Sequence, residues 1–155
     1  MEKHGGAIMG KRIIIADLDG TLSDYGHRIH LYKEKDYTAF NKAGIGDKPI
    51  EKICNIIRML HGEDDGETEI VIMTARDESC RKDTSKWLRL NDIPYDRLIM
   101  RPLKDMSSDP DCKRKLFEDN FDYKDIWFVL EDRKCVVDMW RGEGLTCLQV
   151  APGDF

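Results

Sequence analysis

The strongest constraint on the fold is a short apolar run, Ile13 to Ala16, that ends abruptly in the letters DLDG (17–20). The run shows no alternation of apolar and polar residues, so it predicts a strand that is buried on both faces. An Asp-Gly pair after a strand is also typical of a hairpin turn. A long polar stretch follows here instead of a second alternating strand, which argues against the hairpin. The sequence therefore predicts a buried strand whose end carries two carboxylates, Asp17 and Asp19.

Similar apolar runs recur along the chain, and segments with helical character separate them. Further strands are expected at 70–73, 97–100, 126–130 and 146–150, with helices at 49–62, at about 77–91, around 113–117 and through 136–140. Strands that alternate with helices and carry continuous apolar runs predict an α/β fold, in which helices cover both faces of a mainly parallel sheet. Three tryptophans, Trp87, Trp127 and Trp140, have a spacing that favours packing in the core.

Length and composition are those of one ordinary globular domain. The chain has 155 residues, of which 35% are charged and 41% hydrophobic. We expect the domain to span 11–155, and we interpret the first ten residues, MEKHGGAIMG, as a leader or cloning remnant. No apolar run reaches membrane-spanning length, and no signal peptide is recognisable, so we expect no membrane partner.

The net charge of −5 argues against a broad basic surface for nucleic acid. It leaves room for a narrow phosphate site, where a metal ion and a few basic side chains outweigh the average charge. The five cysteines include no Cys-x-x-Cys pair. Their scatter favours buried free thiols in a reducing cytoplasm, with no disulfide framework and no zinc site.

Polar residues follow three of the expected strands directly. Asp17 and Asp19 follow the first, Thr74 the second, and the pair Glu131-Asp132 the fourth. Right-handed crossovers place the carboxyl ends of parallel strands at one edge of a sheet, where such folds bind ligands. We therefore expect these side chains to converge.

Carboxylates that converge without compensation repel one another, and a hard divalent cation such as Mg²⁺ relieves this repulsion. With the hydroxyl of Thr74 and the ammonium group of Lys113, the set indicates phosphoryl chemistry. Asp17 is then a metal ligand only, or a nucleophile as well. Asp19 is placed to protonate the leaving oxygen and later to accept a proton from water.

The segments IIIADLDGTL, VIMTAR and VLEDR, together with Lys113, resemble the four motifs of the haloacid dehalogenase superfamily, in order. Thr21 in the first motif resembles the phosphatase branch. The resemblance implies a Rossmann-like three-layer sandwich with a small or minimal cap. Residues 11–155 are also similar to the 3′-phosphatase half of phage polynucleotide kinase/phosphatases, most densely over the last 55 residues. That likeness implies removal of 3′-phosphates from polynucleotide ends or nucleotides.

The resemblance implies a role for each matching residue. Asp17 would be the nucleophile and Asp19 the general acid and base, while Thr74 and Lys113 would hold phosphoryl oxygens. Mg²⁺ would be bound by Asp17, the backbone carbonyl of Asp19 and Asp132, with Glu131 beside it. The residues that would contact the substrate are Thr21, Arg28 and Arg76.

The chain departs from the family pattern at two places. Glu131 stands where an Asp is usual, which makes Asp132 the stronger candidate ligand, and the segment between the first two motifs is longer. No phosphate-binding loop of a kinase occurs. The likeness therefore implies a stand-alone phosphatase, with a separate 5′-kinase or ligase as a partner in the same pathway.

Two other functions stay open from the sequence: a phosphatase of free nucleotides or other small metabolites, and a non-catalytic module that binds nucleic-acid ends. Several polar residues also have a simpler interpretation. Arg28 and Arg76 could be solvated surface residues, and His27 and His30 are expected to be polar loop residues. Arg101, Asp105 and Asp109 are expected to order the loop before Lys113.

Overall fold

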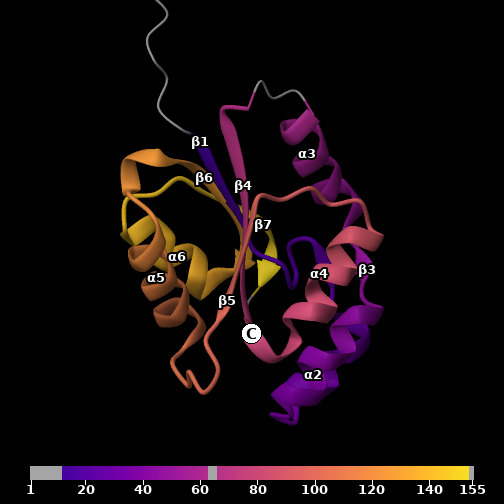
Figure 1. Cartoon of the computed structure of the whole chain (residues 1–155). Coiled ribbons are helices and arrows are strands. Elements are labelled where there is room, and N and C mark those ends of the chain that lie inside the picture. The colour runs from indigo at the N-terminus through magenta and orange to yellow at the C-terminus, as the bar shows by residue number, and fades with distance from the viewer. Residues whose placement is uncertain (1–11, 63–65, 154–155) are drawn as a thin grey trace, which may run out of the picture.

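A central sheet of five parallel strands organises the protein (Figure 1), as the sequence predicted. The computed structural model describes residues 12–62 and 66–153, so the leader expected at 1–10 lies outside the described residues. The spatial order of the strands is β5-β4-β1-β6-β7. Their bounds are β1 Arg12–Ala16, β4 Thr68–Asp77, β5 Arg97–Arg101, β6 Ile126–Arg133 and β7 Cys147–Gly153.

Helices cover both faces of this sheet. Figure 1 shows α5 and α6 on one side of the strands and α3 and α4 on the other. Their bounds are α3 Glu51–Gly62, α4 Arg81–Leu90, α5 Asp109–Asn120 and α6 Lys134–Gly142. A short 3₁₀ turn, η4 (Tyr123–Asp125), leads into β6. The arrangement is the α/β, Rossmann-like sandwich that the sequence predicted.

Burial on both faces explains why β1 shows no alternation. Ile13 and Ile15 belong to the apolar cluster that includes α5 and α6 residues. Ile14 and Ala16 belong to the opposite cluster, with α3 and α4 residues. Because successive side chains of a strand point to opposite faces, each residue of this central strand meets one of the two cores.

The strands that carry polar residues run further than the apolar runs suggested. β4 continues past Thr74 to Asp77, and β6 continues past Glu131 to Arg133. The pairing register of each strand shifts in this extension. The helix expected at about 77–91 is correspondingly shorter. Asp77 accepts a hydrogen bond from the Ser79 N–H (2.9 Å) and starts a 3₁₀ turn, η3 (Glu78–Cys80), ahead of α4.

The polar segment after β1 folds into a small cap. Two antiparallel strands, β2 (Ser23–Asp24) and β3 (Lys48–Pro49), hold its ends together. The segment between them contains η1 (Gly26–Arg28), α1 (Ile29–Lys33), α2 (Tyr37–Ala43) and η2 (Gly44–Gly46). In Figure 1, α2 lies below α4, at the end of the sheet where the strands finish.

Two predictions about individual side chains are wrong. Trp87 and Trp140 are buried as expected, whereas Trp127 is 46% exposed. Trp127 lies at the start of β6, where it packs on Phe128 and under the Arg12 guanidinium instead of in either core cluster. All five cysteines are free thiols, and four are buried, but Cys135 on α6 is exposed.

None of the helices in the described part of the chain has the length and apolar character needed to span a bilayer.

Trp87 links α4 to the cap, because its indole Nε1–H donates to the backbone carbonyl of Asp47 (2.8 Å). We expect Trp87→Phe to lower the free energy of unfolding by about 1–3 kcal/mol, because it leaves a buried carbonyl without this donor. The exposed Trp127 is the matched control, and Trp127→Phe should change the free energy by less than about 0.5 kcal/mol. Urea unfolding of both variants measures the difference. Equal changes in the free energy of unfolding would show that the hydrogen bond from Trp87 to the Asp47 carbonyl adds no stability.

Candidate active site

The carboxyl ends of β1, β4 and β6 bring the candidate residues together. β1 pairs with β4 on one side and β6 on the other, so the order of the strands reverses beside it. Asp17 follows β1, Thr74 lies near the end of β4, and Glu131 and Asp132 lie near the end of β6. Ligand sites of open α/β sheets form at this kind of position.

A buried lysine joins the strands at the centre of the site. Lys113 comes from α5, and its Nζ lies 2.5 Å from Asp17 Oδ1 and 2.6 Å from Glu131 Oε2. All three side chains are almost fully buried. Burial alone would lower the pKa of Lys113, but the charges of Asp17 and Glu131 outweigh it and raise the pKa above its usual range. The lysine therefore stays charged and compensates the two carboxylates.

Asp17 and Asp132 have unusually basic carboxylates. Burial, and then the charge of Glu131, raise the pKa of Asp17 to about 7. Burial, and then the charge of Asp17, raise the pKa of Asp132 to about 6. Thr21 lies between these two residues, and its hydroxyl is 3.4 Å from an oxygen of each. The structure thus places Thr21 against the carboxylates.

The loop after β1 depends on a glycine. Gly20 has φ = +87°, and a Cβ at this position would lie 2.2 Å from Asp132 Oδ2. Only glycine combines this backbone conformation with so close an approach. The N–H groups of Thr21, Leu22 and Ser23 donate to the carbonyl of Leu18, which closes the loop tightly. The sequence Asp-x-Asp-Gly-Thr therefore builds the loop as well as supplying its acids.

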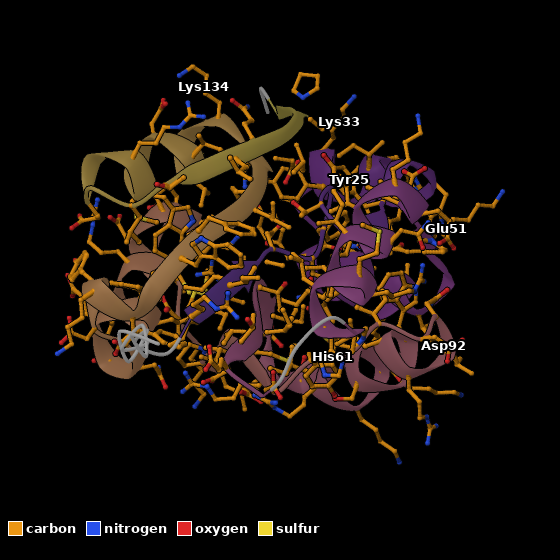
Figure 2. The ribbon with its side chains drawn as sticks, turned by 90° about the horizontal axis from the view of Figure 1, so that it is seen from above. Tyr25, Lys33, Glu51, His61, Asp92 and Lys134 are labelled. Carbon is orange, nitrogen blue, oxygen red and sulfur yellow. The ribbon has the colours of Figure 1, made fainter. Side chains whose placement is uncertain are left out.

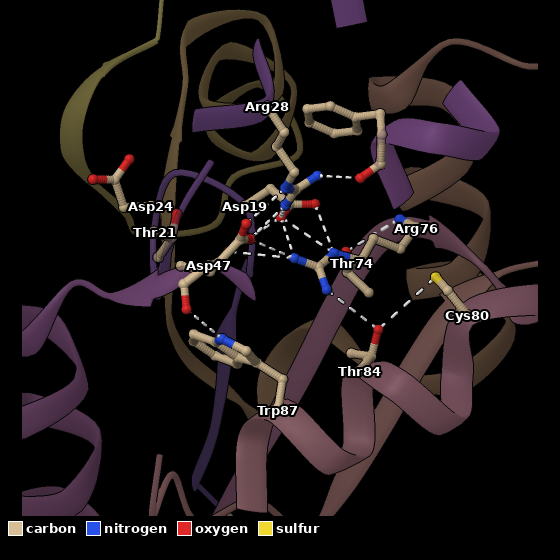
Figure 3. Close-up of polar contacts among 12 residues, drawn as sticks. Asp19, Thr21, Asp24, Arg28, Asp47, Thr74, Arg76, Cys80, Thr84 and Trp87 are labelled. Carbon is tan, nitrogen blue, oxygen red and sulfur yellow. Dashed lines mark hydrogen bonds and ion pairs between the residues drawn. The ribbon is translucent and has the colours of Figure 1, made fainter. Parts of the chain in front are cut away.

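A second network surrounds Asp19 and contains two arginines (Figure 3). Arg76 binds Asp19 through Nε (3.0 Å to Oδ2) and Nη2 (2.6 Å to Oδ1), and Arg28 also pairs with Asp19 through Nη2. Arg28 and Arg76 are 1% and 2% exposed, so the interpretation of both as solvated surface residues is wrong. Burial raises the pKa of Asp19, but Arg76 and Arg28 outweigh it and hold the pKa well below its usual range.

Asp47 is a site residue that the sequence analysis missed. Its side chain is fully buried and accepts from Arg28 Nε (2.7 Å) and from Arg76 Nη2 (2.9 Å). It also contacts His27 Nε2 at 2.8 Å, which gives this predicted loop residue a partner. Asp47 therefore holds both guanidinium groups in place. The sequence offered only a weak indication of this role, namely a single acid after the glycine-rich turn 44–46.

Gly44 makes room for one of these arginines. A Cβ on Gly44 would lie 2.7 Å from the Cζ atom of Arg76. The guanidinium group therefore packs directly on the backbone of the cap. Thr74 is also buried here, and its hydroxyl accepts from the N–H of Arg76 at 3.1 Å.

The loop before α5 is ordered as predicted. Arg101 Nη2 donates to Asp109 Oδ1 (2.6 Å), and Arg101 also lies 3.7 Å from Asp105. Arg133 pairs with the other oxygen of Asp109 and donates from Nη2 to the hydroxyl of Tyr32 at 2.6 Å. The start of α5 is therefore connected to the end of β6 and to the cap.

The residues present fit a divalent cation. One carboxylate oxygen each from Asp17, Glu131 and Asp132 lies within 4.8 Å of the others. Glu131 already accepts from Lys113 and from the N–H groups of Asp132 and Arg133 (3.2 Å each), so Asp17 and Asp132 are the better placed ligands. Carboxylate oxygens are the ligands that Mg²⁺ prefers.

The charge balance favours the same conclusion. In the described part of the chain, the two linked networks contain more carboxylates than side chains with a permanent positive charge. The carboxylates are Asp17, Asp19, Asp47, Glu131 and Asp132, and the cations are Arg28, Arg76 and Lys113. The excess is reflected in the pKa values of Asp17, Asp132 and Glu131, all of which are raised, first of all by burial.

This chain is similar to a known protein family and to a viral protein. The family model described as "Polynucleotide kinase PNKP phosphatase domain" matches residues 11–155. A protein of Autographa californica nuclear polyhedrosis virus, described as a bifunctional polynucleotide kinase/RNA ligase, is 30% identical over 132 residues. The match covers 84% of this chain and 18% of that protein.

Solved structures of similar proteins match this chain over most of its length. A chain of a Pnkp1/Rnl/Hen1 complex is 31% identical with a TM-score of 0.80, and the match covers 96% of this chain and 49% of that one. A chain of a Pnkp1/Rnl/Hen1 RNA repair complex is 28% identical with a TM-score of 0.81, over 99% and 48% of the two chains. A haloacid dehalogenase-like hydrolase from Streptococcus pneumoniae shares the fold, with 19% identity, a TM-score of 0.62 and coverage of 90% and 84%.

This chain spans about half the length of the two related solved chains and a smaller share of the viral protein. The match to the family model nevertheless includes every candidate residue of the site. The chain therefore belongs to the family of polynucleotide kinase PNKP phosphatase domains, and it is a phosphatase of the haloacid dehalogenase type.

Proposed function

We propose that this protein is a Mg²⁺-dependent phosphomonoesterase that removes 3′-phosphates from polynucleotide ends or nucleotides, through a phosphorylated Asp17. The observation that carries the proposal is the contact of Lys113 with Asp17, beside Asp132 and the arginine pair. A carboxylate, an ammonium group and two guanidinium groups at one sheet edge suit a phosphate dianion. We assign this activity to a single domain, residues 11–155, which the family match supports.

Asp17 is the proposed nucleophile. One carboxylate oxygen attacks phosphorus in line, the bond from phosphorus to the 3′-oxygen breaks, and Asp19 gives its proton to that oxygen. Water then attacks phosphorus, Asp19 accepts the proton of the water, and inorganic phosphate leaves Asp17. Lys113 donates to Asp17 Oδ1 at 2.5 Å, which fixes the rotation of the carboxylate before the attack.

The two arginines, Arg28 and Arg76, would control the protonation state of Asp19 during the catalytic cycle. Without substrate, Arg28 and Arg76 bind Asp19 and hold its pKa low. A bound phosphate would compete with Asp19 for both guanidinium groups, so Asp19 could then carry the proton that the leaving oxygen needs. Thr74 would hold a phosphoryl oxygen, and Asp47 keeps the arginines at the site through their shared ion pairs.

A bound Mg²⁺ would neutralise charge on the phosphoryl oxygens and on the carboxylates around them. The residues proposed to hold it are Asp17, Asp132 and the backbone carbonyl of Asp19, with Glu131 as the partner of Lys113. The hydroxyl of Thr21 lies 3.4 Å from an oxygen of each side-chain ligand and can donate its one proton to either of them.

Two further proposals concern a partner in the pathway and the cellular compartment. The names of the relatives combine a polynucleotide kinase with an RNA ligase, or Pnkp1 with Rnl and Hen1 in RNA repair. We propose that a 5′-kinase or a ligase acts on the same ends after this phosphatase. A reducing compartment such as the cytoplasm is supported by the five free thiols.

The alternative substrate is a free nucleotide or another small phosphorylated metabolite, since the same residues would act on it. Three substrates separate the two functions: a 3′-phosphorylated oligonucleotide, a 3′-mononucleotide and a sugar phosphate. We expect kcat/KM to be highest for the oligonucleotide, because the proposed substrate extends beyond the phosphate. Equal or faster turnover of the sugar phosphate would refute the polynucleotide assignment.

Asp17→Asn tests the nucleophile. We expect it to lower kcat by more than about a thousandfold for both an aryl phosphate and the oligonucleotide, because an amide does not form the phosphorylated intermediate. Folding should persist, since the change removes one charge from a site with excess negative charge. The matched control is Asp24→Asn on β2, where the side-chain oxygen that accepts from the Gly26 N–H (2.8 Å) is retained. Substantial activity in Asp17→Asn would exclude Asp17 as the nucleophile.

The raised pKa values of Asp17 and Asp132 predict how Mg²⁺ affects stability at different pH. Without metal, the folded state binds protons that the unfolded state releases above pH ~4, so stability falls as pH rises toward about 6 to 7. Mg²⁺ should relieve the repulsion between the ionised carboxylates at pH 8, whereas protons compete with it at pH 5.5.

We therefore expect Mg²⁺ at a hundredfold excess over its Kd to raise Tm by about 5–10 °C at pH 8, and by much less at pH 5.5. Differential scanning fluorimetry measures both values. Asp132→Asn is the control, and it should lose most of the rise at pH 8. A rise that is independent of pH and of Asp132 would place the cation elsewhere.

A further inference from the structure

The cap carries a pocket that the proposed mechanism does not use. It has a volume of about 420 Å³, which lies within the ~300–1,000 Å³ range of small-molecule sites. Its lining consists of three aromatic rings, two basic side chains and one aliphatic side chain: Tyr25, Tyr32, Tyr37, Lys33, Lys35 and Ile29. Figure 2 shows Tyr25 and Lys33 close together at this side of the molecule.

Tyr25 connects this pocket with the catalytic loop. A Cβ on Gly20 would lie 2.9 Å from Tyr25 Cε1 and 2.2 Å from Asp132 Oδ2. The ring therefore packs against the loop that carries Asp17 and Asp19. Burial, and then the charges of Asp132 and Asp19, raise the pKa of its hydroxyl. Tyr25 thus borders both the pocket and the loop that carries the candidate catalytic acids.

The other two rings of the pocket pack against each other. Tyr32 and Tyr37 pack edge to face, with centroids 5.5 Å apart and an interplanar angle of 69°. Arg133, the last residue of β6, donates a hydrogen bond of 2.6 Å to the hydroxyl of Tyr32. Tyr37 is 49% exposed, which leaves part of its ring accessible to a ligand.

Lys35 occupies a backbone position that disfavours lysine. The N–H of Lys35 donates to the carbonyl of Tyr32, and the N–H of Asp36 donates to that of Leu31, so α1 ends in a Schellman motif. Lys35 takes the left-handed position of this motif, with φ = +61°, where glycine or asparagine is favoured. Lysine is uncommon in this conformation, and the Lys35 side chain lines the pocket.

We infer that this pocket binds the single-stranded polynucleotide leading to the 3′-phosphate, with bases stacked on Tyr25 and Tyr37 and backbone phosphates paired with Lys33 and Lys35. The inference rests on the proposed function for the position of the reacting end. Aromatic rings and lysines in one groove are the combination that binds single strands without reading their sequence.

The chemistry of the lining favours an extended single strand over the other nucleic-acid ligands. A mononucleotide would reach the ring of Tyr25 but has no second phosphate for Lys33 or Lys35. A duplex has its bases stacked and paired, so they are not accessible to tyrosine rings. The patch has few cations, which agrees with the net charge of −5 and predicts a shallow dependence of affinity on salt.

Binding of a fluorescent octanucleotide with a 3′-hydroxyl tests the pocket without turnover, and anisotropy gives its Kd. We expect Tyr37→Ala to raise Kd by about 5- to 100-fold through the loss of stacking, and Tyr37→Phe to stay within about twofold of the unmodified chain. Lys35→Asn should reduce the slope of log affinity against log salt by about 0.7. Asparagine tolerates the left-handed backbone, so Tm should not fall.

The matched control for Lys35→Asn is Lys104→Asn. Lys104 also has a left-handed backbone (φ = +67°) but does not line the pocket, so its replacement should leave the salt slope unchanged. Turnover of an aryl phosphate should be unchanged in all four variants. Turnover of the 3′-phosphorylated octanucleotide should fall in proportion to its binding in Tyr37→Ala.

The failure of this inference differs from the failure of the proposed function. Two results would overturn the inference that the pocket binds a single strand. One is unchanged octanucleotide binding in Tyr37→Ala, and the other is binding of a blunt duplex as tight as that of the single strand. Loss of strand binding in Tyr37→Ala supports the pocket even if the chain hydrolyses none of the three phosphate substrates, in which case the proposed function fails alone.

Discussion

The structure of the site depends on the burial of Lys113 between Asp17 and Glu131. Buried charges of one sign are unstable unless opposite charges and hydrogen bonds compensate them. The lysine comes from α5, whereas Asp17 directly follows β1 and Glu131 belongs to β6, so its two ion pairs fix the helix against both strands. The position of Asp17, the proposed nucleophile, and the packing of the core are therefore coupled.

The arginine network around Asp19 likewise compensates buried charges with partners from different elements. Asp47 belongs to the cap, Arg76 to β4, and Asp19 to the loop after β1. Because Asp47 binds both guanidinium groups, it would keep them in place if, as proposed, a phosphate replaced Asp19 as their other partner. The cap thus contributes to the proposed phosphate site as well as to the tyrosine-lined pocket.

Much of this arrangement could be predicted from local patterns. Continuous apolar runs identified the five parallel strands, and the polar residues after them identified the converging edge. The lengths of the strands were less predictable, because Thr74 and Glu131 lie inside strands that continue in a shifted register. The burial of Trp127 was also mispredicted, because the spacing of apolar residues along a strand does not tell which of them the rest of the fold covers.

The sequence by itself determined the fold class, the acids and the lysine of the site, because periodicity and strand-end chemistry are local properties of the chain. Only the tertiary structure decided which partners these groups have. Asp47 became a site residue, Arg28 and Arg76 became buried, and the tyrosines of the cap formed one pocket. The physical reason is that charge compensation and ring packing depend on distances between segments far apart in sequence, which no local pattern specifies.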